Sequence, residues 1–195
     1  MVHLPASIRN AKPSRKRLRV SDWDRRDNLG PESSLQLAPR AEGHRKSVAM
    51  KLKAFTLLSL ATAVSLYILI VIGGLVASTG SGLACPDWPL CNGQVVPTFT
   101  TPVIIEYTHR LWTLVVTALV IATVVFAWKK YHWENKITKF STLTFVLLLG
   151  QVILGMVTVD TRTLPLAVTA HLALATLVFA SALTTSFVSL TQRGQ

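Results

Sequence analysis

Charged residues are scarce over most of this sequence. Thirteen of the 20 lysine and arginine residues precede residue 54, and the remaining 142 residues carry 7 basic and 4 acidic side chains. The formal net charge of +11 is therefore concentrated near the N-terminus and is not spread over a folded surface. This distribution argues against nucleic acid as a partner.

Cysteine is rare as well. Cys85 and Cys91 are too few for a disulfide-stabilised scaffold, and their surroundings do not match a zinc site. Apolar residues are abundant instead, because half of the chain is hydrophobic and the mean hydropathy is +0.45. This composition is typical of a membrane protein.

Residues 1–50 contain four prolines and no sustained hydrophobic period, which predicts a disordered basic N-terminal tail before a membrane domain at residues 51–195. The basic run from Arg15 to Arg19 can bind anionic lipid, but a solvated tail is favoured because no apolar face accompanies it. An alternative is that translation begins at Met50, directly before the first apolar segment, so that residues 1–49 are absent from the mature protein.

Four apolar segments follow, at about residues 55–77, 103–127, 140–159 and 164–190. Each is close to the roughly 20 residues that span a bilayer core. Backbone groups in lipid must be satisfied within each segment, so the sequence predicts an all-α fold, an integral membrane antiparallel four-helix bundle.

The connections predict the orientation of the bundle. The link from Trp128 to Lys139 carries four lysines, whereas the loop from Ser78 to Pro102 has no lysine or arginine. Positively charged loops stay in the cytoplasm. We therefore expect a multi-pass protein of the cell membrane with both termini cytoplasmic and the cysteine-containing loop on the outer face.

Two histidines fall within these segments at matching depth. His109 and His171 each lie about six or seven residues inside the outer end of a span, roughly 9–10 Å below the outer surface. Two level imidazoles on two helices favour axial ligation of a haem iron. The alternative is that each histidine only forms hydrogen bonds between helices. Small residues around His171 leave room for a flat macrocycle; they are Ala167, Ala170, Ala173 and Ala175.

Two charged residues accompany His109. Glu106, three residues earlier on the same helical face, can orient the imidazole, transfer protons or lie near a substrate; the alternative is an interfacial acid paired with Arg110. Arg110 can bind a haem propionate or form a structural ion pair with Glu106 or Asp160.

Further polar residues lie close to these segments. Gln151, in the third segment, is expected to bond between helices in preference to a catalytic role. A disulfide between Cys85 and Cys91 is plausible on the oxidising outer side. Such a bond can be a structural staple or a redox-active or substrate-channelling element.

Four stretches together resemble one family. The loop TGSGLACPDWPLCNG, the EYTHR stretch that opens the second segment, QVILGMVTV in the third and AVTAHLALA in the fourth are similar to the heme A synthase family over about residues 55–190.

The resemblance implies a membrane oxidoreductase that converts a methyl group of haem O to the formyl group of haem A by successive hydroxylations and loss of water. It implies that His109 and His171 are the axial ligand pair, that Glu106 is the essential carboxylate and that Cys85 and Cys91 are the cysteine pair. Haem b is then the expected cofactor and haem O the substrate, with haem O synthase and an unidentified electron donor as possible partners.

Full-length members of the family resemble two four-helix halves in tandem, whereas this chain contains one half and one histidine pair. A homo-oligomer is therefore expected, the alternative being a single bundle served by an outside electron donor. Two other functions compete. A small bis-histidine cytochrome b gives no role to Glu106, and a membrane thiol oxidoreductase leaves His109 and His171 unused.

Overall fold

All regular structure in the described part of the chain is helical. The computed structural model describes the backbone of residues 31–192 and the side chains of residue 50 and residues 53–192. Four long helices and one short 3-10 helix follow in order: α1 (Pro31–Ser78), η2 (Ser81–Leu83), α2 (Thr101–Lys130), α3 (Lys136–Asp160) and α4 (Pro165–Thr191).

The predicted membrane bundle is confirmed. The segment Lys53–Ser78 of α1 and the helices α2, α3 and α4 are each long and apolar enough to cross a membrane. Among helices α2, α3 and α4, the largest difference from the predicted bounds is at α3, which begins four residues before residue 140. The cause is a cap, because the side chain of Asn135 accepts a hydrogen bond from the Ile137 amide at 2.8 Å and starts the helix in the polar connection.

The N-terminal region differs from the prediction. Helix α1 begins at Pro31, so residues 31–50 are helical where a disordered tail was expected. Proline is favoured at the first position of a helix, and extending the membrane helix backwards requires no new nucleus. The basic run from Arg15 to Arg19 lies outside the described residues. By its contacts the chain divides into two units, Met1–Ser47 and Val48–Gln195, and the four membrane spans lie in the second unit.

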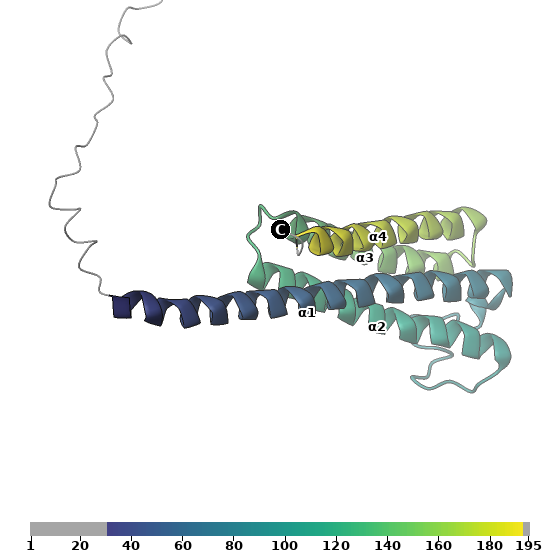
Figure 1. Ribbon diagram of the computed structural model, residues 1–195. Helices are drawn as coiled ribbons and strands as arrows, with labels where there is room; N and C mark the ends of the chain where they lie inside the picture. Colours follow the sequence, from purple (N-terminus) through teal and green to yellow (C-terminus); the bar gives the residue numbers. More distant parts are fainter. Residues whose placement is uncertain (1–30, 193–195) are drawn as a thin grey trace, which may run out of the picture. The chain divides into compact units, whose positions relative to one another are not determined.

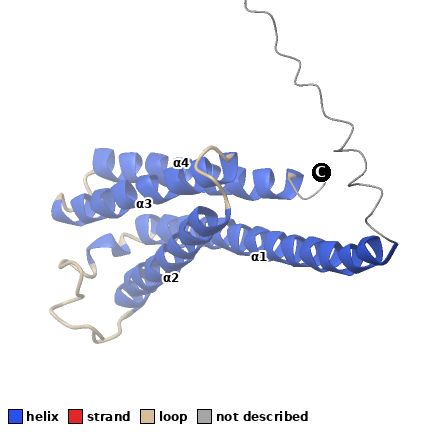
Figure 2. Ribbon diagram, turned by 90° about the vertical axis from the view of Figure 1, so that its left-hand side faces the viewer, coloured by secondary structure: helices blue, strands red, loops and turns tan. Residues whose placement is uncertain are grey.

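All four helices contribute to one core. Figures 1 and 2 show α3 beside α4, with α1 and α2 next to them. The core residues come from every helix and are Ala63, Leu66, Val116, Val120, Leu148, Val178 and Ala182. The indole of Trp112 also donates a hydrogen bond to the Ser65 carbonyl oxygen at 3.0 Å, which joins α2 to α1. The core is therefore continuous across the bundle.

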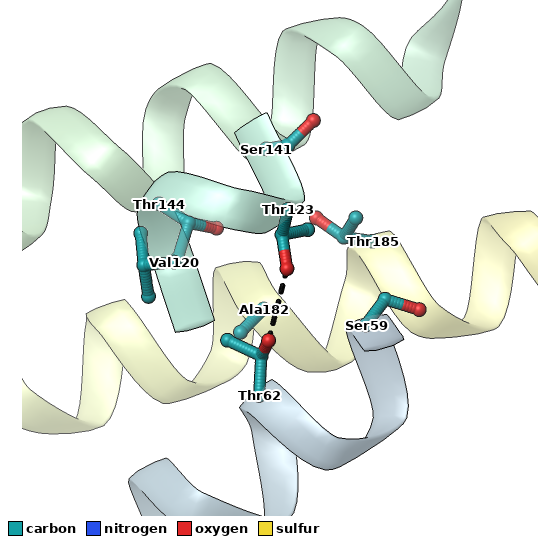
Figure 3. A pocket seen from close by; sticks show the side chains of 8 residues that line it. All are labelled: Ser59, Thr62, Val120, Thr123, Ser141, Thr144, Ala182 and Thr185. Atoms are coloured by element: carbon teal, nitrogen blue, oxygen red, sulfur yellow. Dashed lines mark hydrogen bonds between the residues drawn. The ribbon is translucent and has the colours of Figure 1, made fainter. Parts of the chain in front are cut away.

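Hydroxyl groups line a small cavity of about 10 Å³ within the bundle. Figure 3 shows its lining residues, Ser59, Thr62, Val120, Thr123, Ser141, Thr144, Ala182 and Thr185. The hydroxyls of Thr62 and Thr123 lie 2.9 Å apart, and Thr123 also bonds the Leu119 carbonyl of its own helix. The hydrophobic effect does not drive helices together in lipid. Small side chains and hydrogen-bonded hydroxyl groups therefore account for this close packing.

The core assignment predicts a contrast between two neighbouring leucines. Leu148 is 2% exposed, whereas Leu149 is 50% exposed on the surface of the bundle. We expect Leu148→Ala to lower the free energy of unfolding by about 2 kcal/mol or more, because it leaves a cavity among packed side chains. Leu149→Ala should cost under about 1 kcal/mol. Denaturation of the purified protein in detergent measures both values, and equal losses would contradict the assignment.

Candidate functional site

The bundle has two chemically different ends. We call the end with Cys85 and Cys91 the disulfide end, and the end with the lysines that close α2 and open α3 the lysine end. Both predicted ligand histidines lie towards the disulfide end. His109 is eight residues after the start of α2, and His171 is six residues after the start of α4. These positions correspond to roughly 12 Å and 9 Å along the helices.

Each histidine ring lies against a glycine of the preceding helix. A Cβ added at Gly73 of α1 would come within 3.1 Å of Cε1 of His109, and a Cβ at Gly155 of α3 would come within 3.1 Å of Cε1 of His171. Any larger residue at either position would push the ring away. The Nδ1 atoms of both rings are buried and have no hydrogen-bond partner among the described residues. The two helix pairs therefore hold their imidazoles in equivalent ways.

Gln151 bonds between helices, as predicted. Its side-chain Nε2 donates to the backbone oxygen of His171 at 3.0 Å and lies 3.3 Å from Nε2 of the same imidazole. This amide fixes α3 against α4 at the level of the site. The sequence did not reveal that the partner of Gln151 is His171 itself.

The donor set fits a haem better than a bare metal ion. No group of three or more histidine, cysteine, aspartate or glutamate side chains in the described part of the chain is arranged to hold a metal. Two imidazoles with unpartnered Nδ1 atoms supply only two ligands. A haem iron needs no more than two axial ligands, because the macrocycle provides the others.

Glu106 and Arg110 form a buried ion pair. The Nε of Arg110 donates to Oε1 of Glu106 at 2.9 Å, and Glu106 is only 5% exposed. Of the partners considered for Arg110 from the sequence, the structure selects Glu106 over Asp160. Spacing of four residues on one helix places the two side chains on the same face.

Arg110 also binds the backbone of the cysteine-containing loop. Its Nη1 donates to the carbonyl oxygens of Asp87 at 2.6 Å and Leu90 at 2.7 Å. Its Nη2 donates to the carbonyl oxygen of Cys85 at 2.6 Å. Figure 2 shows this loop, drawn in tan, next to the end of α2. One guanidinium therefore connects the loop to Glu106 and to the helix that carries His109.

The predicted disulfide is confirmed. Cys85 and Cys91 are bonded, and both are buried, at 0% and 1% exposure. They pack with Val103 and Tyr107 of α2, and the Tyr107 hydroxyl donates to the carbonyl oxygen of Val95 at 2.8 Å. The disulfide and the tyrosine therefore hold the loop against the same helix as Arg110.

Asp87 organises the turn that follows. Its two carboxylate oxygens accept hydrogen bonds from the amides of Asn92 at 2.6 Å and Gly93 at 2.8 Å. Both residues have positive φ, at 53° and 71°, as the centre of an Asn-Gly hairpin turn requires. The Gly93 and Asn92 amides, aided by the charge of Arg110, hold the pKa of Asp87 below its usual value.

Sequence reasoning missed two features of the site. Gly73 was not singled out, although the Gly73-Gly74 pair near the end of the first apolar segment was a signal that another helix approaches there. The contacts of Arg110 with loop carbonyls had no signal in the sequence, because any backbone can offer such acceptors.

Comparison with known proteins gives a consistent result. A family model described as COX15-CtaA, "Cytochrome oxidase assembly protein", matches residues 56–194. The chain is 39% identical over 132 residues to the heme A synthase of Bacillus pumilus and 33% identical over 132 residues to that of Bacillus licheniformis. It is also 34% identical over 126 residues to the heme A synthase of Bacillus cereus.

The chain spans less than half the length of these relatives. The matched regions cover 67%, 67% and 64% of this chain, and 43%, 44% and 40% of the three relatives in the same order. The family match includes α2, α3 and α4, the span in α1 from residue 56 onwards, and every residue of the site described above. The chain therefore belongs to the COX15-CtaA family.

Proposed function

We propose that this protein is a heme A synthase, a membrane oxidoreductase that oxidises a methyl group of haem O to the formyl group of haem A. The observation that carries the proposal is that His109 and His171 each lie against a glycine, with a buried Nδ1 that has no partner among the described residues, and that the buried carboxylate of Glu106 lies three residues before His109. The similarity to three heme A synthases supports it.

In this proposal His109 and His171 would hold a haem through its iron. The bound haem supplies the oxidative chemistry, with haem b as cofactor and haem O as substrate. The protein orients the macrocycle through Gly73 and Gly155, which fix the positions of the two imidazoles. The Gln151 amide keeps α3 and α4 in register next to His171.

Glu106 is the proposed proton-transfer group. It lies one helical turn from His109, and its Oε1 is occupied by Arg110 at 2.9 Å. Because this ion pair fixes the orientation of the Glu106 carboxylate, the position of its second oxygen, Oε2, is fixed as well. Successive hydroxylations and loss of water require protons to be moved next to the reacting carbon, and a buried carboxylate is suited to that task.

We assign Arg110 to positioning rather than to binding a haem propionate. The side chain already makes four hydrogen bonds, one to Glu106 and three to carbonyl oxygens of the loop. A propionate would have to displace some of these partners. The buried disulfide then acts as a staple that keeps the Cys85, Asp87 and Leu90 carbonyls in place for Arg110.

The four described membrane helices offer one histidine pair, His109 and His171, so a second haem would need a second bundle. We propose that a second copy of this chain supplies it in a homo-oligomer, with haem O delivered by haem O synthase and electrons by a separate donor. The predicted orientation, with the disulfide end outside, places the site near the outer leaflet. The molecular mass in detergent and the number of haems per chain test the oligomer, and a strictly monomeric active protein would exclude it.

Pigment analysis after co-expression with haem O synthase tests the proposed function. We expect chromatography to detect haem A or a hydroxylated haem O. Glu106→Gln should lower product formation by roughly 10²-fold or more while haem remains bound, since the variant loses proton transfer. His109→Ala and His171→Ala should instead change the haem spectrum or abolish haem binding, since each removes a ligand.

The same experiment distinguishes a heme A synthase from the alternative function. Bound haem b without any oxidised product would identify a small cytochrome b that only carries electrons. Normal product from Glu106→Gln would refute the role given to this carboxylate. Retention of a six-coordinate haem spectrum in both histidine variants would refute the ligand assignment.

The two possible roles of Arg110 predict different phenotypes. With the positioning role, Arg110→Gln leaves three loop carbonyls and Glu106 without their partner, so we expect faster reduction of the disulfide and a loss of product of at least roughly tenfold, with haem content close to normal. Thiol titration during reduction and haem quantification measure the two effects. Loss of haem with an unchanged reduction rate would show that Arg110 binds a propionate instead.

The ionisation of Asp87 makes the stability of the loop depend on pH. Its pKa is lowered in the folded protein, so its contribution to loop stability is complete above the usual aspartate pKa of about 3.9 and is lost as the pH falls through the lower folded value. We expect Asp87→Asn to speed hydrogen exchange at the Asn92 and Gly93 amides at pH 7 and to abolish its acid dependence below pH of about 4. Unchanged protection in this variant would contradict the assigned contacts.

A further inference from the structure

A second pocket lies at the lysine end of the bundle, where α2 ends and α3 begins. Its volume is about 340 Å³, and it is lined by Trp128, Tyr131, Trp133 and Thr138. The site with His109 and His171 lies towards the opposite end of the helices, so this pocket has no part in the proposed reaction.

Two hydroxyl groups in this pocket need a partner. The Tyr131 hydroxyl and Thr138 Oγ1 are buried and form no hydrogen bond among the described residues, and Thr138 is only 1% exposed. A buried hydroxyl without a partner costs free energy. Burial also raises the pKa of Tyr131, so its hydroxyl stays protonated and can donate. A ligand that accepts hydrogen bonds from both hydroxyls would remove this cost.

The charges around the pocket favour an anion. Four lysines lie between residues 128 and 140, against one acid, Glu134, which pairs with Lys139 at 3.0 Å. The Lys130 ammonium lies 5.4 Å from the centre of the Tyr131 ring. Thr138 is the third residue of α3, where the helix dipole is positive and free amide groups attract negative charge.

The tryptophans place the pocket at the level of lipid headgroups. Trp128 and Trp133 are 53% and 59% exposed, and they flank the end of a membrane helix. Tryptophan at such positions lies in the interface between hydrocarbon and water, with its ring among the lipids. The pocket therefore opens where the phosphate groups of a lipid leaflet lie.

We propose that this pocket binds the phosphate of an anionic phospholipid. The Tyr131 and Thr138 hydroxyls donate to the phosphate oxygens, the lysines supply positive charge, and Trp128 and Trp133 contact the adjoining glycerol and acyl groups. The predicted orientation assigns this lipid to the inner leaflet, where basic pockets between helices bind anionic headgroups.

Lipid binding to the full chain in detergent tests the proposal. Native mass spectrometry and thermal unfolding would compare phosphatidylglycerol, phosphatidylcholine and inorganic phosphate. We expect phosphatidylglycerol to be retained preferentially and to raise the Tm most. Thr138→Val and Tyr131→Phe should each weaken phosphatidylglycerol binding roughly tenfold, since each removes a hydrogen bond to a charged group.

Matched substitutions away from the pocket provide the controls. Thr117→Val removes a threonine hydroxyl from α2, and Tyr67→Phe removes a tyrosine hydroxyl from α1. Both variants should leave lipid binding unchanged. Thr138→Ser keeps the hydroxyl and should retain binding, which separates hydrogen bonding from packing and remains informative if Thr138→Val does not fold.

Three results would overturn the proposal. One is equal retention of phosphatidylglycerol and phosphatidylcholine. Another is that Thr138→Val and Tyr131→Phe bind lipid as well as their controls do. The third is stabilisation by inorganic phosphate equal to that by phosphatidylglycerol, which would identify a site for a free anion.

Discussion

The guanidinium of Arg110 is the group on which the disulfide end depends. An irregular loop beside a membrane helix exposes carbonyl oxygens that the helix cannot satisfy, and such groups are costly to leave unpaired away from water. Arg110 donates to three of them and to Glu106. The charge of the arginine is neutralised by the carboxylate, and the carboxylate is fixed by the arginine. The loop and Glu106 are therefore joined to helix α2 through Arg110. His109 directly precedes Arg110 in this helix.

The rest of the bundle associates through small residues and hydroxyl groups. Buried threonines and serines bond to their own helices and, as with Thr62 and Thr123, to a neighbour, so close approach leaves few polar atoms unsatisfied. The same kind of packing occurs at the site. Gly73 and Gly155 have no side chain, and the space this leaves is occupied by the imidazoles of His109 and His171. The packing that joins the helices is therefore the same packing that positions the two histidines.

Much of this arrangement was predictable from the sequence. Apolar length determines the four spans, helical rise determines the level of His109 and His171, and the outer position of two nearby cysteines indicates their disulfide. The contacts of Arg110 were not predictable, because they involve backbone acceptors 20 to 25 residues away in a loop without a regular pattern. The helix at residues 31–50 was missed because a sustained hydrophobic period was the criterion, and this stretch of the sequence shows none.

The two halves of the site are alike in packing but differ in chemistry. Each histidine lies against a glycine of the preceding helix. Helix α4, however, carries no charged residue between Pro165 and Thr191, whereas α2 places Glu106 and Arg110 within four residues of each other and next to His109. Helix α3 adds to the His171 side only the neutral amide of Gln151. The proton transfer that we propose would therefore use the polar groups on the α2 side, next to the loop that Arg110 binds.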